Sequence, residues 1–231
     1  MDTIHAIILG IIQGLTEFLP VSSSGHLEIA KKLLNVHIEE NLLFTVVVHG
    51  ATALSTVVVF RDDIITLLKN IFPLKYTENN QYLLKLALSM IPIGIVGVFF
   101  RDFVETFFTA NLFLVGAMLL VTSLLLGFTH LKKKNDKEFG YIDAFVMGVA
   151  QIFSVLPGLS RSGATIATGL LLGNKKEETA KFSFLMILVP ILGANFLDFL
   201  DIMKGVSPSA SSREFIPLLI GFIAAFLTGV L

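Results

Sequence analysis

The sequence predicts an all-α integral membrane protein, with an inverted-topology repeat, two re-entrant helix-loop-helix hairpins and about five to six transmembrane helices. Hydrophobic residues make up 54% of the 231 residues and charged residues only 15%. The mean hydropathy is +0.82, more than a soluble core of this size needs. In addition, a polar interruption of the apolar sequence recurs 138 residues further along the chain.

The first repeat covers residues 1–131 and begins with a broken apolar segment over residues 4–34. This segment is long enough for two short helices around a loop at Pro20–Gly25. A loop at membrane depth persists only where it is buried in protein or lines a wet cavity, so we expect a re-entrant hairpin. Three spans of about 20 residues follow, over residues 41–60, 82–100 and 111–131.

The second repeat covers residues 140–231 and follows the same plan. Its re-entrant hairpin is predicted over residues 140–173, with the loop at Pro157–Gly163, and its spans over residues 179–202 and 215–231. Both repeats belong to a single membrane domain over residues 1–231. Because the first hairpin is followed by three spans and the second by two, the symmetry predicts a further span beyond Leu231.

A constant offset of 138 residues relates the two breaks. It aligns five residues of the first break, in order, with identical residues of the second: Gly10, Gln13, Ser22, Ser24 and Gly25 with Gly148, Gln151, Ser160, Ser162 and Gly163. Paired breaks in corresponding halves of a membrane protein indicate the functional site. Nine Lys and Arg residues are expected on the side opposite the N-terminus and five on the N-terminal side. This excess of Lys and Arg predicts that the side opposite the N-terminus is cytoplasmic. The two hairpins are then expected to enter from opposite faces.

Composition restricts the chemistry and the partners. The chain has no cysteine, which excludes disulfides and thiolate catalysis. Its formal net charge of −1 argues against a nucleic-acid partner. The expected partner is the lipid bilayer, and a homodimer stays open because the sequence does not fix the oligomeric state.

The first break carries an acid and a possible proton carrier. Gln13 and Glu17 are four residues apart and share one helix face. A carboxylate at mid-membrane depth costs about 2.5–3.5 kcal/mol, so Glu17 is expected to be functional; the alternative is a helix cap near the interface. His26 is expected to transfer protons, although a satisfied buried histidine is the plain alternative.

Three serines, Ser22, Ser23 and Ser24, precede Gly25 at the expected start of the second short helix. Hydroxyl and free N–H groups at such a junction form an anion cradle, although one serine is expected to serve as an ordinary N-cap. Ser23 is the candidate nucleophile, with Glu17 or His26 as its base.

The second break carries the guanidinium of Arg161, flanked by Ser160 and Ser162, with Thr165 on the following turn. An arginine at membrane depth must pair or meet a ligand, and its planar fork binds phosphate in a bidentate manner. The alternative is an internal ion pair with Glu17, which could coexist with binding. His49 and Thr52, in the span over 41–60, are interpreted as residues for packing or interhelical hydrogen bonds rather than as part of a site.

At these residues the chain resembles the undecaprenyl-diphosphatase family, integral-membrane enzymes also known for bacitracin resistance. That family shows Glu or Gln, three residues and then Glu, followed by Pro-Val-Ser-Ser-x-Gly-His; Gln13, Glu17 and Pro20 through His26 match this pattern. Its second signature, Pro-Gly-x-Ser-Arg-Ser-x-x-Thr, matches Pro157 through Thr165.

The resemblance implies hydrolysis of undecaprenyl diphosphate to the monophosphate, which recycles the carrier lipid for cell-wall synthesis. It implies a polyprenyl diphosphate substrate, a bacterial plasma (inner) membrane location and a site that opens to the outer side. It also implies Mg²⁺ or Ca²⁺, with Glu17 and Gln13 as candidate ligands; Gln13 stands where some relatives have Glu. A prenyl-phosphate transporter or flippase is the rival function, because inverted repeats with broken helices also build transporters.

The expected mechanism is phosphoryl transfer by positioning and charge neutralisation. Arg161 binds the diphosphate, Ser23 or an activated water attacks the terminal phosphorus, and His26 or Glu17 handles the proton. The remaining expected substrate-binding residues are Gln13, Ser22, Ser24, Ser160, Ser162 and Thr165.

Overall fold

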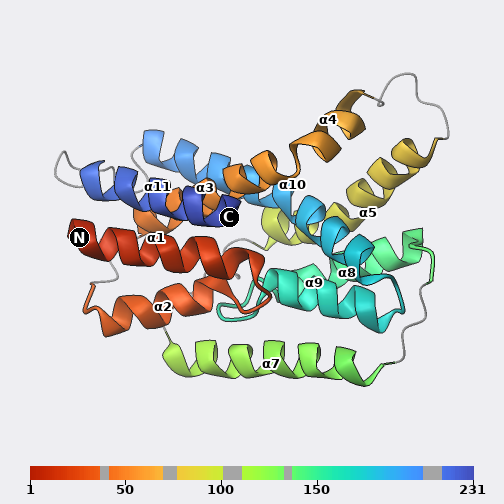
Figure 1. Cartoon of the computed structure of the whole chain (residues 1–231), viewed down its shortest axis with the longest axis horizontal. Coiled ribbons are helices and arrows are strands. Elements are labelled where there is room, and N and C mark those ends of the chain that lie inside the picture. The colour runs from red at the N-terminus through yellow and green to blue at the C-terminus, as the bar shows by residue number, and fades with distance from the viewer. Residues whose placement is uncertain (37–41, 70–76, 101–110, 133–136, 205–214) are drawn as a thin grey trace.

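A computed structural model describes residues 1–36, 42–69, 77–100, 111–132, 137–204 and 215–231 (Figure 1). Within these ranges the chain forms ten α-helices and no β-strand. The helices are α1 (Thr3–Phe18), α2 (Ser23–Leu33), α3 (Leu42–Val59), α4 (Arg61–Lys69), α5 (Glu78–Phe99), α7 (Leu112–Leu131), α8 (Tyr141–Phe153), α9 (Arg161–Leu171), α10 (Lys176–Met203) and α11 (Phe215–Val230). The all-helical prediction is confirmed for this part of the chain.

Three of the described helices are long and apolar enough to cross a membrane: α5, α7 and the Lys176–Leu197 part of α10. A fourth candidate is the pair of α3 and α4, which is bent by 70°. The sequence predicted five to six spans, whereas the described residues contain three candidate spans, or four if the bent pair is one span. The 16 residues of α11 reach only about 24 Å, less than a hydrocarbon core of about 30 Å.

Side-chain caps define where several helices begin. Asp2 accepts a hydrogen bond from the backbone N–H of Ile4 at the start of α1, over 2.6 Å. Thr77 accepts from the N–H of Asn80 at the start of α5, and the Asn111 side chain accepts from the first turn of α7. These polar caps satisfy N–H groups that have no partner within their own helices, so an apolar segment can begin a helix there.

The two broken segments lie toward opposite ends of the long axis (Figure 1). The pair α1–α2 lies toward the end that holds the N-terminus, and the pair α8–α9 lies toward the other end. Each pair packs on a different helix, because α1 packs on α11 whereas α8 packs on α5. Glycines allow both close approaches: a Cβ on Gly10 would lie 2.9 Å from the Ala224 Cβ, and one on Gly148 would lie 2.9 Å from the Ser89 Cα.

The buried apolar residues form two clusters that match this arrangement. One joins α1, α2, α3 and α11 and includes Leu9, Phe44 and Ala225. The other joins α3, α5, α8 and α10 and includes Met147 and Phe182. Each broken helix pair therefore has its own apolar support, and the polar breaks lie between the two clusters.

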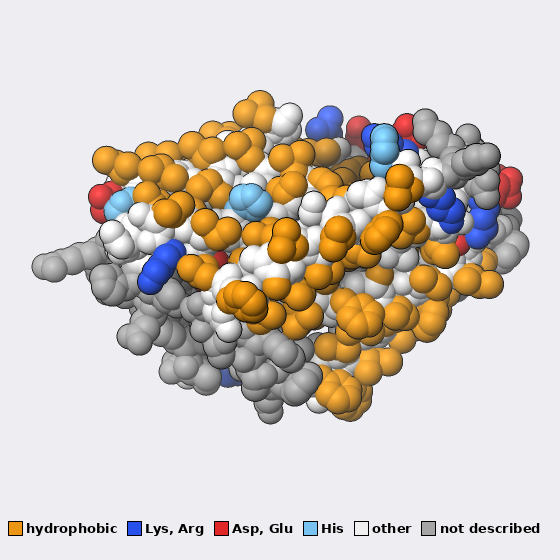
Figure 2. Space-filling model, turned by 90° about the horizontal axis from the view of Figure 1, so that it is seen from below, with side chains coloured by type: hydrophobic (Ala, Val, Ile, Leu, Met, Phe, Trp, Pro, Cys, Tyr) orange, Lys and Arg blue, Asp and Glu red, His pale blue; other side chains and the backbone are white. Residues whose placement is uncertain are grey.

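The outer surface suits a lipid environment. Figure 2 shows hydrophobic side chains over most of one face, with charged side chains gathered mainly toward one end. Along α7, large apolar side chains point outward; Phe113 is 86% exposed and Leu131 is 78% exposed. Hydrocarbon solvates such a surface at no cost, whereas water does not.

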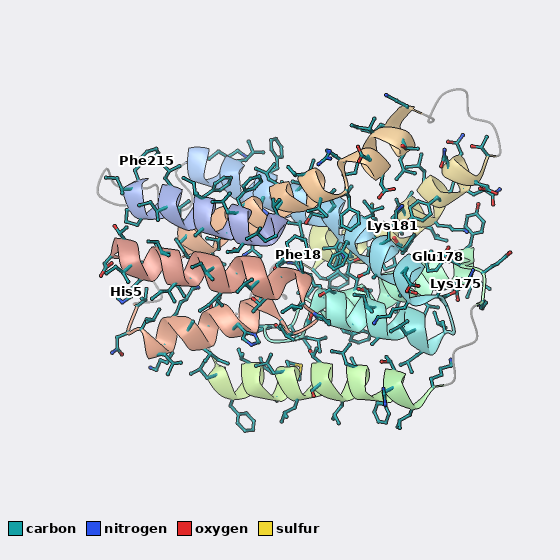
Figure 3. The ribbon with its side chains drawn as sticks, in the orientation of Figure 1. His5, Phe18, Lys175, Glu178, Lys181 and Phe215 are labelled. Atoms are coloured by element: carbon teal, nitrogen blue, oxygen red, sulfur yellow. The ribbon has the colours of Figure 1, made fainter. Side chains whose placement is uncertain are left out.

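Phe18 lies near the middle of the long axis (Figure 3). His5 and Phe215 mark one end, and Lys175, Glu178 and Lys181 mark the other (Figure 3). Five basic residues counted in the sequence-based orientation, Lys75, Arg101, Lys133, Lys134 and Arg213, lie outside the described residues. Helix α4 was not predicted from the sequence. It is joined to α10 by an ion pair, in which Lys181 Nζ lies 2.5 Å from Asp63 Oδ1.

Candidate functional site

The first break follows from a proline and a serine. Leu19 is extended, as expected for a residue before proline, so α1 ends at Phe18. Ser22 then adopts a positive φ of 70° and caps α2, accepting a hydrogen bond from the N–H of Gly25 at 3.2 Å. The cap directs the start of α2, and with it Ser23, back toward the end of α1.

The second break has the same local design. After α8 and a turn, Gly158 takes a φ of +93°, which strongly favours glycine. Ser160 caps α9 and accepts a hydrogen bond from the N–H of Gly163 at 3.0 Å. In each break the capping serine also contacts the serine two residues later, Ser22 with Ser24 and Ser160 with Ser162, both at 3.3 Å.

The two breaks touch each other and share one supporting helix. A Cβ on Gly25 would lie 3.3 Å from the Cα of Gly158, so the loops are in direct contact. Helix α7 covers both: its Leu119 side chain lies beside Gly25, and its Thr122 hydroxyl accepts a hydrogen bond from the Ser160 N–H at 3.1 Å. Segments far apart in the sequence are thereby held in one place.

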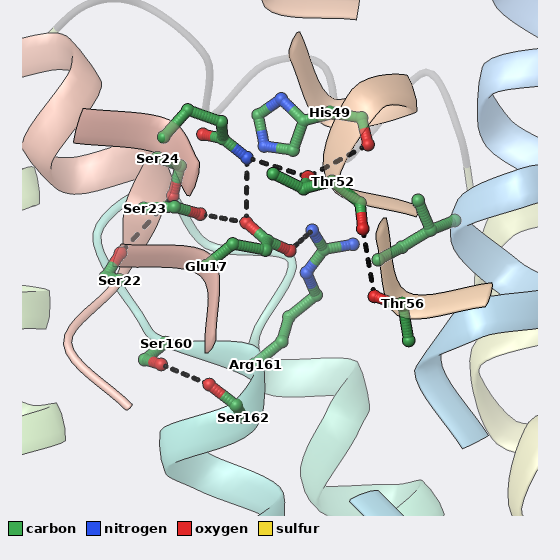
Figure 4. Close-up of polar contacts among 12 residues, drawn as sticks. Glu17, Ser22, Ser23, Ser24, His49, Thr52, Thr56, Ser160, Arg161 and Ser162 are labelled. Carbon is green, nitrogen blue, oxygen red and sulfur yellow. Dashed lines mark hydrogen bonds and ion pairs between the residues drawn. The ribbon is translucent and has the colours of Figure 1, made fainter. Parts of the chain in front are cut away.

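An ion pair lies where the breaks meet (Figure 4). Arg161 Nη2 donates to Glu17 Oε1 at 3.2 Å across 144 residues of sequence. The Glu17 side chain is 13% exposed and that of Arg161 is 32% exposed. The internal ion pair considered from the sequence is therefore present, and the more exposed guanidinium remains open to a ligand.

The other Glu17 oxygen receives two further donors. Ser23 Oγ donates to Glu17 Oε2, and Gln13 Nε2 donates to the same oxygen at 3.0 Å. A serine hydroxyl that donates to a carboxylate has its base in place, which is the arrangement of an activated nucleophile. The structure thus brings together Gln13, Glu17, Ser23 and Arg161.

His26 lies apart from this cluster in its hydrogen bonding. Its Nδ1 is 2.8 Å from the Ser22 carbonyl oxygen. A carbonyl only accepts, so Nδ1 carries a proton and donates this bond. In the part of the chain that is described, this bond goes to the α2 cap and not to Glu17 or Ser23.

Thr165 is positioned behind Arg161. Its hydroxyl donates to the Arg161 carbonyl oxygen at 2.8 Å and contacts the Ser183 hydroxyl of α10 at 2.6 Å. Both hydroxyls belong to fully buried residues, so Thr165 anchors α9 to α10 here. A direct contact of Thr165 with substrate would require these bonds to change.

Helix α3 supplies two neighbours of the site, His49 and Thr52, which the sequence analysis assigned to packing or interhelical hydrogen bonds; Thr52 forms such a bond. Thr52 Oγ1 accepts a hydrogen bond from Gln13 Nε2 at 3.2 Å. His49 lies near enough to interact electrostatically with both Glu17 and Arg161 (Figure 4). The available signal was the spacing of His49, Thr52 and Thr56, which puts three polar side chains on one face of an apolar helix.

The donor set fits a cation that arrives with a phosphate better than a cation held by protein alone. Among the described residues no group of three or more His, Cys, Asp and Glu could hold a metal ion. Gln13 Oε1 is buried without a hydrogen-bond partner, but it is the Nε2 end of this amide that faces Glu17. Mg²⁺ commonly uses one or two protein carboxylates together with substrate phosphates, and Glu17 is the carboxylate that this cluster offers.

Comparison with known proteins gives a consistent result. The family model described as bacitracin resistance protein BacA matches residues 6–231. A protein of Bacteroides thetaiotaomicron named undecaprenyl-diphosphatase is 50% identical over 100% of this chain and 88% of its own length. Proteins with that name from Christiangramia forsetii and Methanococcus vannielii are 51% and 41% identical, over 100% and 97% of this chain and 86% of their own lengths. The resemblance seen in the two motifs is confirmed.

Proposed function

The chain belongs to the bacitracin resistance protein BacA family, and we propose that it hydrolyses undecaprenyl diphosphate where its two breaks meet. The relatives at about 50% identity over the whole chain bear the name of this phosphatase. The products are undecaprenyl phosphate and inorganic phosphate, so the reaction returns the carrier lipid to cell-wall synthesis. The transporter alternative is not favoured by these relatives.

One observation carries the assignment of the site. Glu17 and Arg161 meet at 3.2 Å although they come from separate breaks, and a serine hydroxyl donates to the same carboxylate. A guanidinium, a carboxylate base and a hydroxyl are the groups that phosphoryl transfer needs. Their position between two apolar clusters suits a substrate with a lipid tail and an anionic head.

The reaction begins with the diphosphate bound to Arg161. When the terminal phosphate approaches, the guanidinium exchanges its contact with Glu17 for phosphate oxygens, which leaves the carboxylate free to act as a base. Ser22, Ser24, Ser160 and Ser162 border the same space and supply hydroxyl groups to the remaining oxygens. The serine caps also point the N-termini of α2 and α9 toward the anion.

Ser23 is the proposed nucleophile. Its Oγ forms a bond to the terminal phosphorus while its proton moves to Glu17, and the bond from that phosphorus to the bridging oxygen breaks. Undecaprenyl phosphate leaves with the electron pair. A water molecule then attacks the phosphoserine, Glu17 returns the proton to Ser23 Oγ, and inorganic phosphate is released. In the competing mechanism Glu17 or His26 activates a water molecule that attacks the diphosphate directly.

Gln13 and Glu17 would hold a divalent cation, Mg²⁺ or Ca²⁺, through Oε1 of the amide and an oxygen of the carboxylate. When bound, the cation would neutralise charge on the phosphate oxygens. Because Gln13 Nε2 now donates to Glu17, the amide would have to turn before Oε1 and the carboxylate could meet one cation. Thr165 keeps Arg161 in place through its bond to the Arg161 carbonyl.

We also propose that the helix pairs are re-entrant hairpins of an inverted repeat. A shift of 138 residues carries Ser23–Leu33 onto Arg161–Leu171, and carries the cap of Ser22 onto that of Ser160. The pairs lie at opposite ends of the long axis (Figure 1), which supports hairpins that enter from opposite faces. By the excess of Lys and Arg, the end opposite the N-terminus faces the cytoplasm of a bacterial plasma membrane, and the site opens outward.

The experiment that tests the function is phosphate release from undecaprenyl diphosphate by the chain purified in detergent micelles. We expect release that stops with a chelator and returns with Mg²⁺ or Ca²⁺. An Arg161→Ala preparation controls for contaminating phosphatases. Transport of the lipid across vesicles without phosphate release would instead support the transporter function and remove the proposed one.

A further inference from the structure

We propose that three phenylalanine rings, Phe18, Phe60 and Phe184, bind the first isoprenoid units of the substrate next to its diphosphate. These three residues are called the ring trio below. They belong to α1, to the junction between α3 and α4, and to α10. The inference rests on the proposed function and deepens it, because it assigns residues to the lipid tail, whereas the groups described above contact the anionic head.

The members of the ring trio contact each other. The ring centroids of Phe18 and Phe184 are 5.8 Å apart, with 45° between the ring planes. Those of Phe60 and Phe184 are 5.9 Å apart, with 31° between the planes. All three residues are partly exposed, whereas Phe44 and Phe182 of the two apolar clusters are fully buried. An apolar chain can therefore reach the ring trio from outside.

Two of these rings lie close along the chain to residues of the site. Phe18 directly follows Glu17 in the last turn of α1. Phe60 lies one helical turn after Thr56, the last polar residue on the α3 face that borders the site, and its N–H donates to the Thr56 carbonyl at 2.9 Å. Both rings therefore lie within one turn of polar groups at the site.

The third ring belongs to the helix that anchors Arg161. Phe184 follows Ser183 on α10, and the Ser183 hydroxyl lies 2.6 Å from that of Thr165. Thr165 in turn donates to the Arg161 carbonyl at 2.8 Å. Because Phe184 contacts Phe18, the ring trio joins the helix that supports the guanidinium to α1, the helix that carries the carboxylate.

The surroundings of the ion pair favour one direction for the tail. Figure 4 shows the serines of both breaks on one side of the Glu17–Arg161 pair and Thr56 on the other. Free hydroxyls covered by an apolar chain would lose their hydrogen bonds to water, which is unfavourable. The Thr56 hydroxyl is already satisfied, since it donates to the Thr52 carbonyl at 2.9 Å. We therefore expect the tail to leave on the side of Thr56, toward the ring trio.

The tail of the bound substrate is a better occupant than an acyl chain of a bilayer lipid. A tail joined covalently to a diphosphate on Arg161 has a high effective concentration at rings so close to the site, whereas a free acyl chain has none of this advantage. Phenyl rings offer a large and rigid apolar contact area. Covering their exposed parts removes apolar surface from water, so the contact favours a prenyl diphosphate over a short ester.

The test compares phosphate release from geranyl diphosphate, which has two isoprenoid units, with release from methyl diphosphate, which has none. The ratio of kcat/KM for the two substrates is measured for each protein in detergent micelles. We expect Phe184→Ala and Phe60→Ala to lower this ratio about 10-fold. Phe196→Ala is the matched control, because Phe196 lies 12 residues further along α10 and is 61% exposed. Its ratio should equal that of the wild type. General damage to the fold lowers both rates alike and leaves the ratio unchanged.

A wild-type ratio near one, or an unchanged ratio in Phe184→Ala and Phe60→Ala, overturns the inference and leaves the rings as packing between helices. Should Phe184→Ala fail to fold, Phe184→Leu, which keeps an apolar side chain without the ring, is measured in its place.

Binding of non-hydrolysable analogues separates this inference from the proposed function. The thermal midpoint of each protein is followed with the geranyl and methyl esters of methylenediphosphonate. A wild type that releases no phosphate removes the proposed function. If the geranyl ester alone then binds about 10-fold more weakly to Phe184→Ala than to the wild type, the ring trio keeps its role. Equal binding of the geranyl ester to both proteins overturns that role.

Discussion

Glu17 and Arg161 can serve both as a structural ion pair and as catalytic groups. They are 144 residues apart in sequence and 3.2 Å apart in space. A buried charge without a partner is costly, so the pair neutralises both residues while the site has no substrate. A diphosphate offers Arg161 a better partner than one carboxylate, because its oxygens match both N–H groups of the fork. In the proposed mechanism, this exchange of partners releases Glu17 at the moment a base is needed.

Replacement of Arg161 by lysine tests the need for the planar fork. We expect Arg161→Lys to lose roughly 2–4 kcal/mol of transition-state stabilisation, which slows turnover about 10²- to 10³-fold although the charge is kept. Phosphate release at saturating substrate measures the effect. Arg61→Lys is the control, since Arg61 is exposed on α4 and should tolerate the change. Near-normal turnover of Arg161→Lys would remove Arg161 from the site.

Three adjacent serines allow a test of the nucleophile. Ser23→Ala should abolish nearly all turnover while the protein stays folded, because its hydroxyl is the one that donates to Glu17. Ser22→Ala should cost about 1 kcal/mol of stability through loss of the α2 cap, and Ser24→Ala less, with the chemistry largely kept. Rapid acid quench should trap a phosphoserine in the wild type. Substantial turnover by Ser23→Ala without such an intermediate would favour direct attack by water.

At the residue level the two motifs could be read from the sequence, but their neighbours on α3 could not. Pro20, Ser22 and Ser160 mark breaks by local chemistry, which a sequence displays. The contact between Gln13 and Thr52 depends on how α1 packs against α3, a tertiary fact. The histidine that interacts with Glu17 is His49, whereas His26 is hydrogen-bonded to the Ser22 carbonyl. The sequence favoured His26 because only His26 belongs to a motif.

The element that holds the breaks together is α7. A Cβ on Gly158 would lie 2.8 Å from the Val115 Cα, at a φ that L-residues rarely adopt. We therefore expect Gly158→Ala to lower stability by about 1–3 kcal/mol from backbone strain alone, with further loss from the clash. Gly127→Ala, on α7 with open space around its Cα, should be neutral or slightly stabilising. Thermal unfolding in detergent compares the two, and equal midpoints would contradict the close packing of this break on α7.

Helix positions were more predictable than helix junctions. The spans predicted over 82–100 and 111–131 correspond to α5 and α7. They could be predicted because the length of an apolar segment and a capping residue such as Asn111 are visible in the sequence. The junction between α3 and α4 was missed. Helix α4 has only nine residues and contains Asp62, Asp63 and Lys69, so its sequence does not look like a span. Its apolar side chains pack against the cluster that includes α5 and α10, which the sequence does not reveal.

The proposed repeat relates two breaks that share their caps but differ in their charged residues. The capping serines and the Gly10 and Gly148 contacts are shared, whereas Glu17 and Arg161 each occur in one copy only. The carboxylate of the site comes from one break and the guanidinium from the other, so the site is asymmetric even though the caps are alike. Membrane orientation follows from the same proposed repeat if its halves are inverted.

Single cysteines can test the inverted orientation, because the chain has none of its own. Lys32→Cys, in the last turn of α2, and Lys175→Cys, just before α10, replace exposed lysines at opposite ends of the molecule. We expect a membrane-impermeant thiol reagent to label Lys32→Cys from outside right-side-out vesicles and Lys175→Cys only after the membrane is opened. Labelling of both residues from the same side would rule out the proposed topology.

The most direct test of one shared site is a double-mutant cycle between its two halves, measured as phosphate release from undecaprenyl diphosphate. The proteins compared are the wild type, Glu17→Gln, Arg161→Lys and the double variant. Groups that act as a unit in one transition state are not additive, so the double variant should be about as slow as the slower single variant. Independent action would instead multiply two losses of about 10²- to 10³-fold into one of about 10⁴- to 10⁶-fold. Multiplied losses, or a single variant that keeps the wild-type rate, would contradict a common site for Glu17 and Arg161.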